Sequence, residues 1–349
     1  MLQVLKRLDL QRWQPHVYCL THRGVLADDL EELGIPVTCY GLRSWNLPLV
    51  LWKLRTALKN TEPQIVQTFL YHANLLGRIA AWLAGVPHVL SGIRVAEKRS
   101  RLRLWLDRWT NRFVTQHVCV SQSVATFSRE QGGLPEHKLV VVPNGVDVER
   151  FRDAKPADLS QFGVPDDSFT VLFVGRLEPQ KNPHMLLEGV GPLFAQHSGL
   201  HVLFVGAGAL ESSLRERCAT LDCADRVHFA GRQTDIPGIM RACGCLALTS
   251  LWEGMPNVVL EAMAAGLLVI STEVEGIREL IPDEAPLKGF VIPYGDVGRG
   301  LIAECVEVAI KCHPTKEITE PAMAHVRQHF TWDSAASAYE QLYEQLLTN

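Results

Sequence analysis

Short apolar runs alternate with helical patterns along nearly the whole chain, and this alternation restricts the fold more than any other feature. Strands that are separated by helices pair side by side in parallel sheets, with the helices covering both faces. The sequence therefore predicts an α/β protein. We expect strands at 16–20, 65–68, 88–90, 117–120, 139–142, 170–174, 201–205, 227–229, 245–248 and 268–271.

The alternation is interrupted once, where residues 151–167 are rich in Asp, Pro and Gly and have weak periodicity. A chain of 349 residues also exceeds the size at which single cores stop growing, so two domains are expected. We place an N-terminal domain at 1–148, a linker at 149–168 and a C-terminal domain at 169–331. The stretch 332–349 is predicted to form a last helix.

Two carboxylates flank a predicted helix start in segment 249–266, which reads TSLWEGMPNVVLEAMAAG. Glu253 lies in the loop, Pro256 suits the first helical turn, and Asn257 and Glu261 share one helix face. The free N–H groups of a helix start favour phosphate, whereas carboxylates favour hydroxyl groups. This arrangement indicates a nucleotide-sugar site. The alternative is that both glutamates belong to a solvated helix face.

A second candidate loop follows the strand at 170–174. Gly175 and Arg176 come directly after the strand, and Lys181 follows just before a helical pattern that begins after Pro183. An arginine fork and a lysine on a loop at a strand end are suited to gripping a diphosphate. The alternative is two solvated cations. The later run VGAGAL is not a dinucleotide fingerprint, because Glu211 occupies the place of its third glycine.

Charge is distributed unequally along the chain. Residues 1–150 carry 19 Lys and Arg against 12 Asp and Glu, whereas the remainder carries 15 against 26. Such asymmetry favours an anionic partner for the first half. Segment 94–112 is basic and interleaved with Trp and Leu, which indicates either contact with an anionic membrane surface or an ordinary surface helix. No groove-reading or base-stacking motif accompanies the charge, so nucleic acid is not expected as a partner.

The nine cysteines are odd in number and scattered, which favours a reduced, cytoplasmic compartment. No apolar run approaches 18 residues, so no membrane span is expected. Together with the basic segment, this composition predicts a cytoplasmic protein that lies peripherally on the inner face of the membrane.

Five stretches together resemble one known family. They are YHANLLGRIAAWLAGVP, VVPNGVD, VGRLEPQK, VGAGALESSL and SLWEGMPNVVLEAMAAG, and they look like retaining glycosyltransferases of family 4. The resemblance implies the GT-B fold, in which two Rossmann-like parallel-sheet domains face a cleft. It also implies that the last helix crosses back onto the N-terminal domain, which binds the acceptor.

The resemblance also assigns roles to residues. Arg176 and Lys181 would neutralise the donor diphosphate, Glu261 would hold the ribose hydroxyls, and Glu253 would hold the transferred sugar. His72 matches a cleft histidine of several relatives, although a histidine at a strand end can also be purely structural. No metal and no cofactor other than the nucleotide sugar are expected. The expected donor-binding residues are Gly175, Gly254, Met255, Pro256, Asn257, Val258 and Glu261.

The chain departs from the family pattern at its start. Relatives begin with a strand and a glycine-rich loop, whereas this sequence starts inside the following helix, whose apolar face is Val4, Leu5 and Leu8. We expect a vacant position in the middle of the first sheet. Our hypothesis is that Met1 is an internal methionine of a reading frame that is longer by roughly 15–20 residues. Otherwise the chain would bind donor but transfer poorly.

The expected function is transfer of a hexosyl or N-acetylhexosaminyl group, with retention, from a nucleotide sugar to a lipid-linked or polysaccharide acceptor. A UDP-sugar is favoured over GDP-mannose. Two alternatives remain open: a catalytically weak homologue that acts as a nucleotide-sugar-binding or partner subunit, and a GT-B sugar-nucleotide epimerase.

Overall fold

The computed structural model describes the chain except residues 99, 222, 282–289, 313–315 and 349, and it contains two compact units. The first unit is Met1–Asn144 with Trp332–Asn349, and the second is Gly145–Thr331. All ten strands that the sequence predicts are present, nine within two residues of their expected ends, whereas β4 continues three residues beyond its expected end. Two further short strands, β2 (Val37–Cys39) and β12 (Phe290–Ile292), were not predicted.

The parallel layer of the first unit is divided into two sheets. One contains β1 and β2, and the other has the order β3-β4-β5-β6. The strands are β1 (Val17–Cys19), β3 (Ile65–Phe69), β4 (His88–Ile93), β5 (Gln116–Cys119) and β6 (Leu139–Val141). The helices are α1 (Leu2–Leu5), α2 (Ala27–Glu32), α3 (Leu47–Thr61), α4 (Tyr71–Ala84), α5 (Arg101–Thr110), α6 (Gln122–Glu130) and α15 (Trp332–Thr348), with 3-10 turns η1 (Ser44–Asn46), η2 (Asn111–Phe113) and η3 (Glu136–Lys138).

The two sheets share their packing partners on both faces. Val17 of β1 and Ile65 of β3 join one core cluster with α1 and α15, whereas Tyr18 and Val66 join another with α3 and α4. Successive strand residues point to opposite faces, so β1 and β3 belong to one layer. Within the part of the chain that the structure describes, no backbone hydrogen bond joins them. The break lies inside the layer, where the sequence predicts a vacant position.

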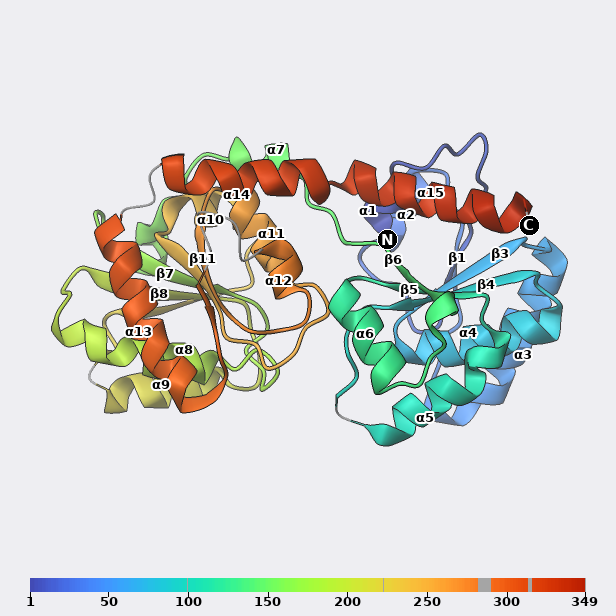
Figure 1. The fold of residues 1–349 in the computed structure, drawn as a ribbon, viewed down its shortest axis with the longest axis horizontal. Coiled ribbons are helices and arrows are strands. Elements are labelled where there is room, and N and C mark those ends of the chain that lie inside the picture. Colours follow the sequence, from blue (N-terminus) through green and yellow to red (C-terminus); the bar gives the residue numbers. More distant parts are fainter. Residues whose placement is uncertain (99, 222, 282–289, 313–315, 349) are drawn as a thin grey trace. The chain divides into compact units, whose positions relative to one another are not determined.

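Helix α15 closes one face of the first unit against the chain start (Figure 1). Tyr339 and Leu342 pack with Val4 and Leu5 of α1 in the same buried cluster. Arg7 Nε donates to Asp333 Oδ1 at 2.8 Å. The expected apolar face of the first helix is therefore buried.

The second unit contains one continuous parallel sheet with the order β12-β11-β10-β7-β8-β9. Its remaining strands are β7 (Phe169–Val174), β8 (Leu200–Val205), β9 (Val227–Gly231), β10 (Cys245–Leu248) and β11 (Leu268–Thr272). Its helices are α7 (Val148–Arg152), α8 (Pro183–Val190), α9 (Glu211–Thr220), α10 (Ile236–Ala242), α11 (Asn257–Ala264), α12 (Ile277–Leu280), α13 (Gly295–Cys312) and α14 (Lys316–His329), with η4 (Leu159–Phe162) and η5 (Gly191–Ala195).

The central strands of this sheet are buried apolar runs, as expected for strands covered on both faces. Helices α8, α9 and α13 pack their apolar side chains onto one face (Figure 1). Residues 149–168, which the sequence predicts as a linker, include α7 and η4. Phe151 and Val164 of this region, and the adjoining Val148, are buried.

Candidate active site

The topology of the second sheet fixes where a ligand can bind. From β7 the chain proceeds outward through β8 and β9, and β10, β11 and β12 then fill the opposite side. The direction therefore reverses between β7 and β10. In open parallel sheets, ligands bind outside the carboxyl ends of the strands at such a switch point. The loops after β7 and β10 are thus the first place to look for a site.

These two loops supply an ion pair. Lys181, from the loop after β7, places Nζ 2.6 Å from Oε1 of Glu253, from the loop after β10. The side chains are only 17% and 10% exposed, respectively. Partial burial strengthens the attraction between the two charges. The structure therefore brings together two of the residues that the sequence predicts, although they are 72 positions apart.

Hydrogen bonds to backbone carbonyl oxygens hold the two loops in register. Leu251 N donates to Gln180 O at 2.8 Å, and Gln180 Nε2 donates to Trp252 O at 3.0 Å. Thr249 Oγ1 donates to the carbonyl oxygens of Lys181 and Asn182 at 3.1 and 2.9 Å. The Lys181–Glu253 pair is consequently positioned by hydrogen bonds between the two loops and not by the ion pair alone.

Glycines allow a third loop to approach closely. A Cβ atom on Gly208 would lie 2.3 Å from Leu177 O, and one on Gly206, at φ +139°, would lie 1.9 Å from Gly175 O. Only glycine fits such contacts. The approach lets Leu210 N donate to Leu177 O at 2.9 Å. The glycine run after β8 therefore supports the loop that carries Lys181.

Arg176 lies on the same loop but not on the ion pair. Its side chain is 61% exposed, and it donates to Glu178 Oε2 at 2.6 Å and to Gln180 Oε1 at 3.4 Å. Gly175 has its N–H bonded to Val205 O, and the stem of Lys181 passes over it. Arg176 is thus a cation at the edge of the site, held by its own loop.

The segment that leads into α11 is packed tightly. Gly254, Met255 and Pro256 are buried, whereas Asn257 is exposed and Val258 is half-buried. Pro256 precedes the first helical residue instead of occupying the first turn. Its φ of −75° is compatible with that place.

Glu261 lies one turn into α11 and is separate from the ion pair. Burial raises the pKa of Glu261 to about 7, and the nearby charge of Arg150 only partly opposes this. Arg150 belongs to α7, which packs on α11. Glu261 therefore changes its charge near neutral pH.

Glu253 has a carboxylate neighbour that was not predicted from the sequence. Glu275 Oε2 accepts a hydrogen bond from Glu253 N at 3.1 Å. Burial raises the pKa of Tyr294, and the charges of Glu275, Glu273 and Glu253 add to this. Their positions in the sequence could have indicated this, because Glu273 and Glu275 follow the β11 strand and Tyr294 follows β12 at the same sheet edge.

His72 belongs to the first unit and is therefore described apart from these residues. It is exposed, stands second in α4 and lies edge-on to Tyr71, with ring centroids 5.5 Å apart. Leu70, the residue before α4, has φ 72° and ψ 153°. Side-chain-bearing residues rarely adopt this conformation, and such strain concentrates at functional sites.

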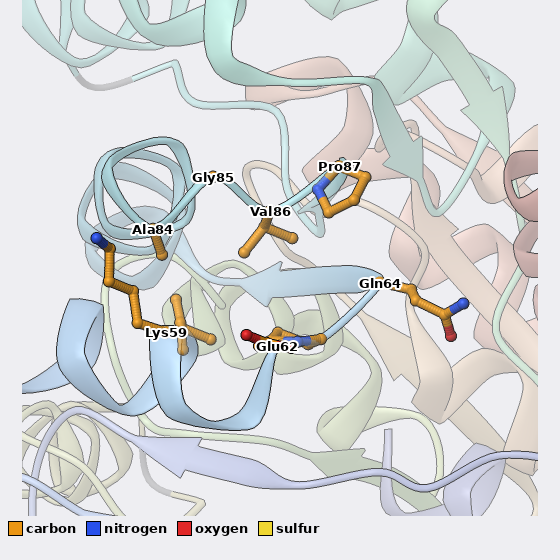
Figure 2. A pocket seen from close by; sticks show the side chains of 9 residues that line it. Lys59, Glu62, Gln64, Ala84, Gly85, Val86 and Pro87 are labelled. Carbon is orange, nitrogen blue, oxygen red and sulfur yellow. The ribbon is translucent and has the colours of Figure 1, made fainter.

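A hollow of about 450 Å³ in the first unit is a poor candidate for this chemistry (Figure 2). Lys59 and Glu62 line it from the end of α3, and Gly85 and Pro87 line it from the turn before β4. These residues precede β3 and β4, so the hollow lies at the amino ends of the strands. Ligands of parallel sheets bind at the opposite ends.

Comparison with known proteins agrees with this geometry. Residues 1–150 match the model of glycosyltransferase family 4, and residues 154–311 match that of glycosyl transferases group 1. The chain is 32% identical over 313 residues to the Escherichia coli UDP-Gal:alpha-D-GlcNAc-diphosphoundecaprenol alpha-1,3-galactosyltransferase, covering 85% of this chain and 80% of the relative. The chain belongs to glycosyltransferase family 4.

Other relatives support the family and the fold. The putative glycosyltransferase EpsD of Bacillus subtilis is 31% identical over 300 residues, which is 81% of this chain and 77% of EpsD. Anabaena HepE, solved in complex with UDP-glucose, matches with a TM-score of 0.84 at 23% identity, covering 100% of this chain and 96% of HepE. This family 4 glycosyltransferase thus has the GT-B fold, with two Rossmann-like parallel-sheet domains.

Proposed function

We propose that this chain transfers a hexosyl or N-acetylhexosaminyl group from a UDP-sugar to a lipid-linked or polysaccharide acceptor, with retention of anomeric configuration. The observation that carries the proposal is the Lys181–Glu253 pair at the switch point of the second sheet, with Arg176 on the same loop as Lys181. UDP-galactose is the first donor to test, because the Escherichia coli relative is named for it.

In the proposed donor complex, the lysine and arginine of the loop after β7 pair with the diphosphate instead of with their glutamate partners. The diphosphate attracts Lys181 and Arg176, which neutralise it as it leaves. Glu253 then accepts hydrogen bonds from hydroxyl groups of the transferred sugar. Glu261, one turn into α11, accepts from the ribose hydroxyls. The backbone N–H groups between Gly254 and Asn257 lie at the helix start, where an anion is favoured.

The proposed reaction needs no protein nucleophile. The bond between the anomeric carbon and the diphosphate oxygen breaks, and the acceptor oxygen bonds to the same face of that carbon. The acceptor proton passes to the leaving diphosphate oxygen. In this proposal Arg176 and Lys181 supply the positive charge that a metal ion would otherwise provide, so a chelator should leave transfer unchanged. His72 is proposed to donate to the donor phosphate or sugar.

The test is an assay with UDP-galactose and other UDP-sugars, a polyprenyl-diphosphate N-acetylglucosamine acceptor, and a chelator in parallel samples. Mass spectrometry detects the product and NMR reads its anomeric configuration. Glu253→Gln should abolish most transfer, and Glu216→Gln, at an exposed position, should not. Conversion of the donor without acceptor would instead indicate an epimerase. Donor binding without transfer to any acceptor would indicate a binding subunit.

A further inference from the structure

Five of the eight tryptophans are exposed, and all five lie on neighbouring helices of the first unit. They are 45% to 74% exposed, and they come from η1, α3, α4 and α5: Trp45, Trp52, Trp82, Trp105 and Trp109. Tryptophan is normally highly buried, so this concentration requires an explanation. Four leucines on the same helices are also exposed: Leu47, Leu49, Leu83 and Leu102.

The three helices form one continuous layer. Helix α3 packs on α4 and α4 packs on α5, and Figure 1 shows them together on one side of the strands. Arg55 Nε of α3 donates to Leu83 O of α4 at 3.2 Å. Trp82 contacts Phe113, with ring centroids 4.7 Å apart, and Trp109 lies edge-on to the same ring. We call the exposed side of α3, α4 and α5 the tryptophan face.

On α5 the exposed residues are sorted into two stripes. Leu102, Trp105 and Trp109 are spaced three and four positions apart, which aligns them on one helix face. Arg101 and Arg108 are exposed and seven positions apart on the adjoining face. A helix with one apolar and one basic stripe lies in the plane of a membrane interface.

The charge of the tryptophan face is almost entirely positive. Residues 43–61, 71–84 and 100–113 contain nine Lys and Arg, of which Arg78 is fully buried and Arg103 is paired with Glu97, and a single acidic residue, Asp107. Asp107 is already paired with Arg78, at 2.7 Å, beneath the surface. The side chains that reach solvent therefore attract anions.

The structure corrects the boundaries of the basic segment at 94–112. Arg94 bonds to Asn144, and Arg103 pairs with Glu97 at 2.7 Å while lying over the Tyr71 ring, so both point into the protein. Arg99 lies outside the described residues. Conversely, Trp45, Trp52 and Trp82 belong to the exposed face although they lie far from this segment in sequence.

We propose that the tryptophan face docks this protein on the surface of an anionic lipid bilayer. Tryptophan rings sit at the level of the lipid head groups, and the arginines and lysines pair with lipid phosphates. None of the helices in the described ranges is long and apolar enough to cross a membrane, so the mode is a surface contact. An open hollow of about 440 Å³ between Trp82, Arg112 and Phe113 offers two rings and a guanidinium to one head group.

The experiment is flotation of the full chain with vesicles of phosphatidylcholine, with and without phosphatidylglycerol. We expect flotation only with phosphatidylglycerol. Trp105→Ser with Trp109→Ser should weaken vesicle binding about tenfold or more, because two large apolar side chains are no longer transferred from water into the bilayer. Arg101→Gln with Arg108→Gln should weaken it about fivefold for each charge removed. The control is Val25→Ser with Leu26→Ser, which removes exposed apolar groups elsewhere in the same unit.

Three results would overturn the proposal. They are no flotation of folded wild-type protein, flotation that survives the tryptophan substitutions, and a dimer that those substitutions dissolve without any lipid binding. Circular dichroism and thermal unfolding of each variant, measured without lipid, show that the chain is folded. Lipid binding needs neither donor nor acceptor, so failure of the proposed function and failure of this docking surface are separate results.

Discussion

The two units build their parallel layers from similar elements but complete them differently. The second unit has six consecutive hydrogen-bonded strands, and its candidate site is supported by loops that interlock at the strand ends. The first unit has two sheets in one layer, a charged pair beneath its helices, and an exposed tryptophan face. A site that must position charges within fractions of an ångström needs the continuous framework, whereas a surface that meets a fluid partner does not.

The largest expected effect concerns the buried cation of the first unit. Arg78 is fully buried, donates to Asp107 at 2.7 Å and to Thr110 at 2.8 Å, and also bonds Ser91. Arg78→Met should lower the free energy of unfolding by about 3–5 kcal/mol, because Asp107 is left without its partner. Seven of the eight tryptophans belong to the first unit, so tryptophan fluorescence during urea unfolding follows that unit.

The control for this prediction is the double variant Arg78→Met with Asp107→Asn. It removes the stranded charge and should recover part of the lost stability. If the two variants are equally unstable, lost packing rather than the charge explains the effect. UDP-sugar binding should survive in both variants if the second unit is as self-sufficient as its sheet suggests.

Lys181→Ala tests the candidate site formed by the loops after β7 and β10. We expect transfer to fall by about a hundredfold to a thousandfold, because in the proposed donor complex the developing diphosphate charge loses a partly buried cation. The matched control is Lys155→Ala, at an exposed position of the same unit. Initial rates at saturating acceptor give the comparison. Wild-type rates for Lys181→Ala would show that the ion pair does not contribute to transfer.

Glu261→Gln should change the stability of the protein and its affinity for UDP in opposite directions. The pKa of Glu261 is raised to about 7 in the folded chain, so folding is opposed by the charged form, and this penalty grows as pH rises from about 4.5 to 7. The variant should therefore be more stable than wild type by about 1–3 kcal/mol at pH 8 and nearly equal to it at pH 4.5. It should nevertheless bind UDP more weakly. Thermal unfolding at both pH values and calorimetry measure the two effects.

Glu216→Gln removes an exposed carboxylate of the same unit and should show neither change. A stability difference between Glu261→Gln and wild type that is independent of pH would contradict a titration of Glu261.

The smallest effect compares the sheets directly. Amide hydrogen exchange should be about tenfold slower in β7 and β8 than in β1 and β3, because each of the latter has one unpaired edge. Exchange followed by mass spectrometry on peptides from each strand measures this. Equal protection in the four strands would mean that the break in the layer has no energetic consequence.

Most of the fold could be predicted from the sequence because buried parallel strands are continuous apolar runs. The missed strands, β2 (Val37–Cys39) and β12 (Phe290–Ile292), are three residues long. The equally short β1 and β6 could be predicted because they lie within longer apolar runs at 16–20 and 139–142. Pairing between Lys181 and Glu253 could not be predicted, since no spacing rule connects residues on loops after β7 and β10. The tryptophan face was missed for the same reason: α3, α4 and α5 contribute to it from separate stretches.

The Lys181–Glu253 contact has a consequence for selectivity. A free phosphate that draws Lys181 away leaves Glu253 as an uncompensated anion next to a second anion. A free sugar that engages Glu253 gains nothing from the neighbouring lysine. Only a molecule that joins an anion to hydroxyl groups satisfies both partners at once. If the proposed donor site is correct, we therefore expect it to bind inorganic phosphate and free hexose weakly and to bind a molecule that joins the two covalently.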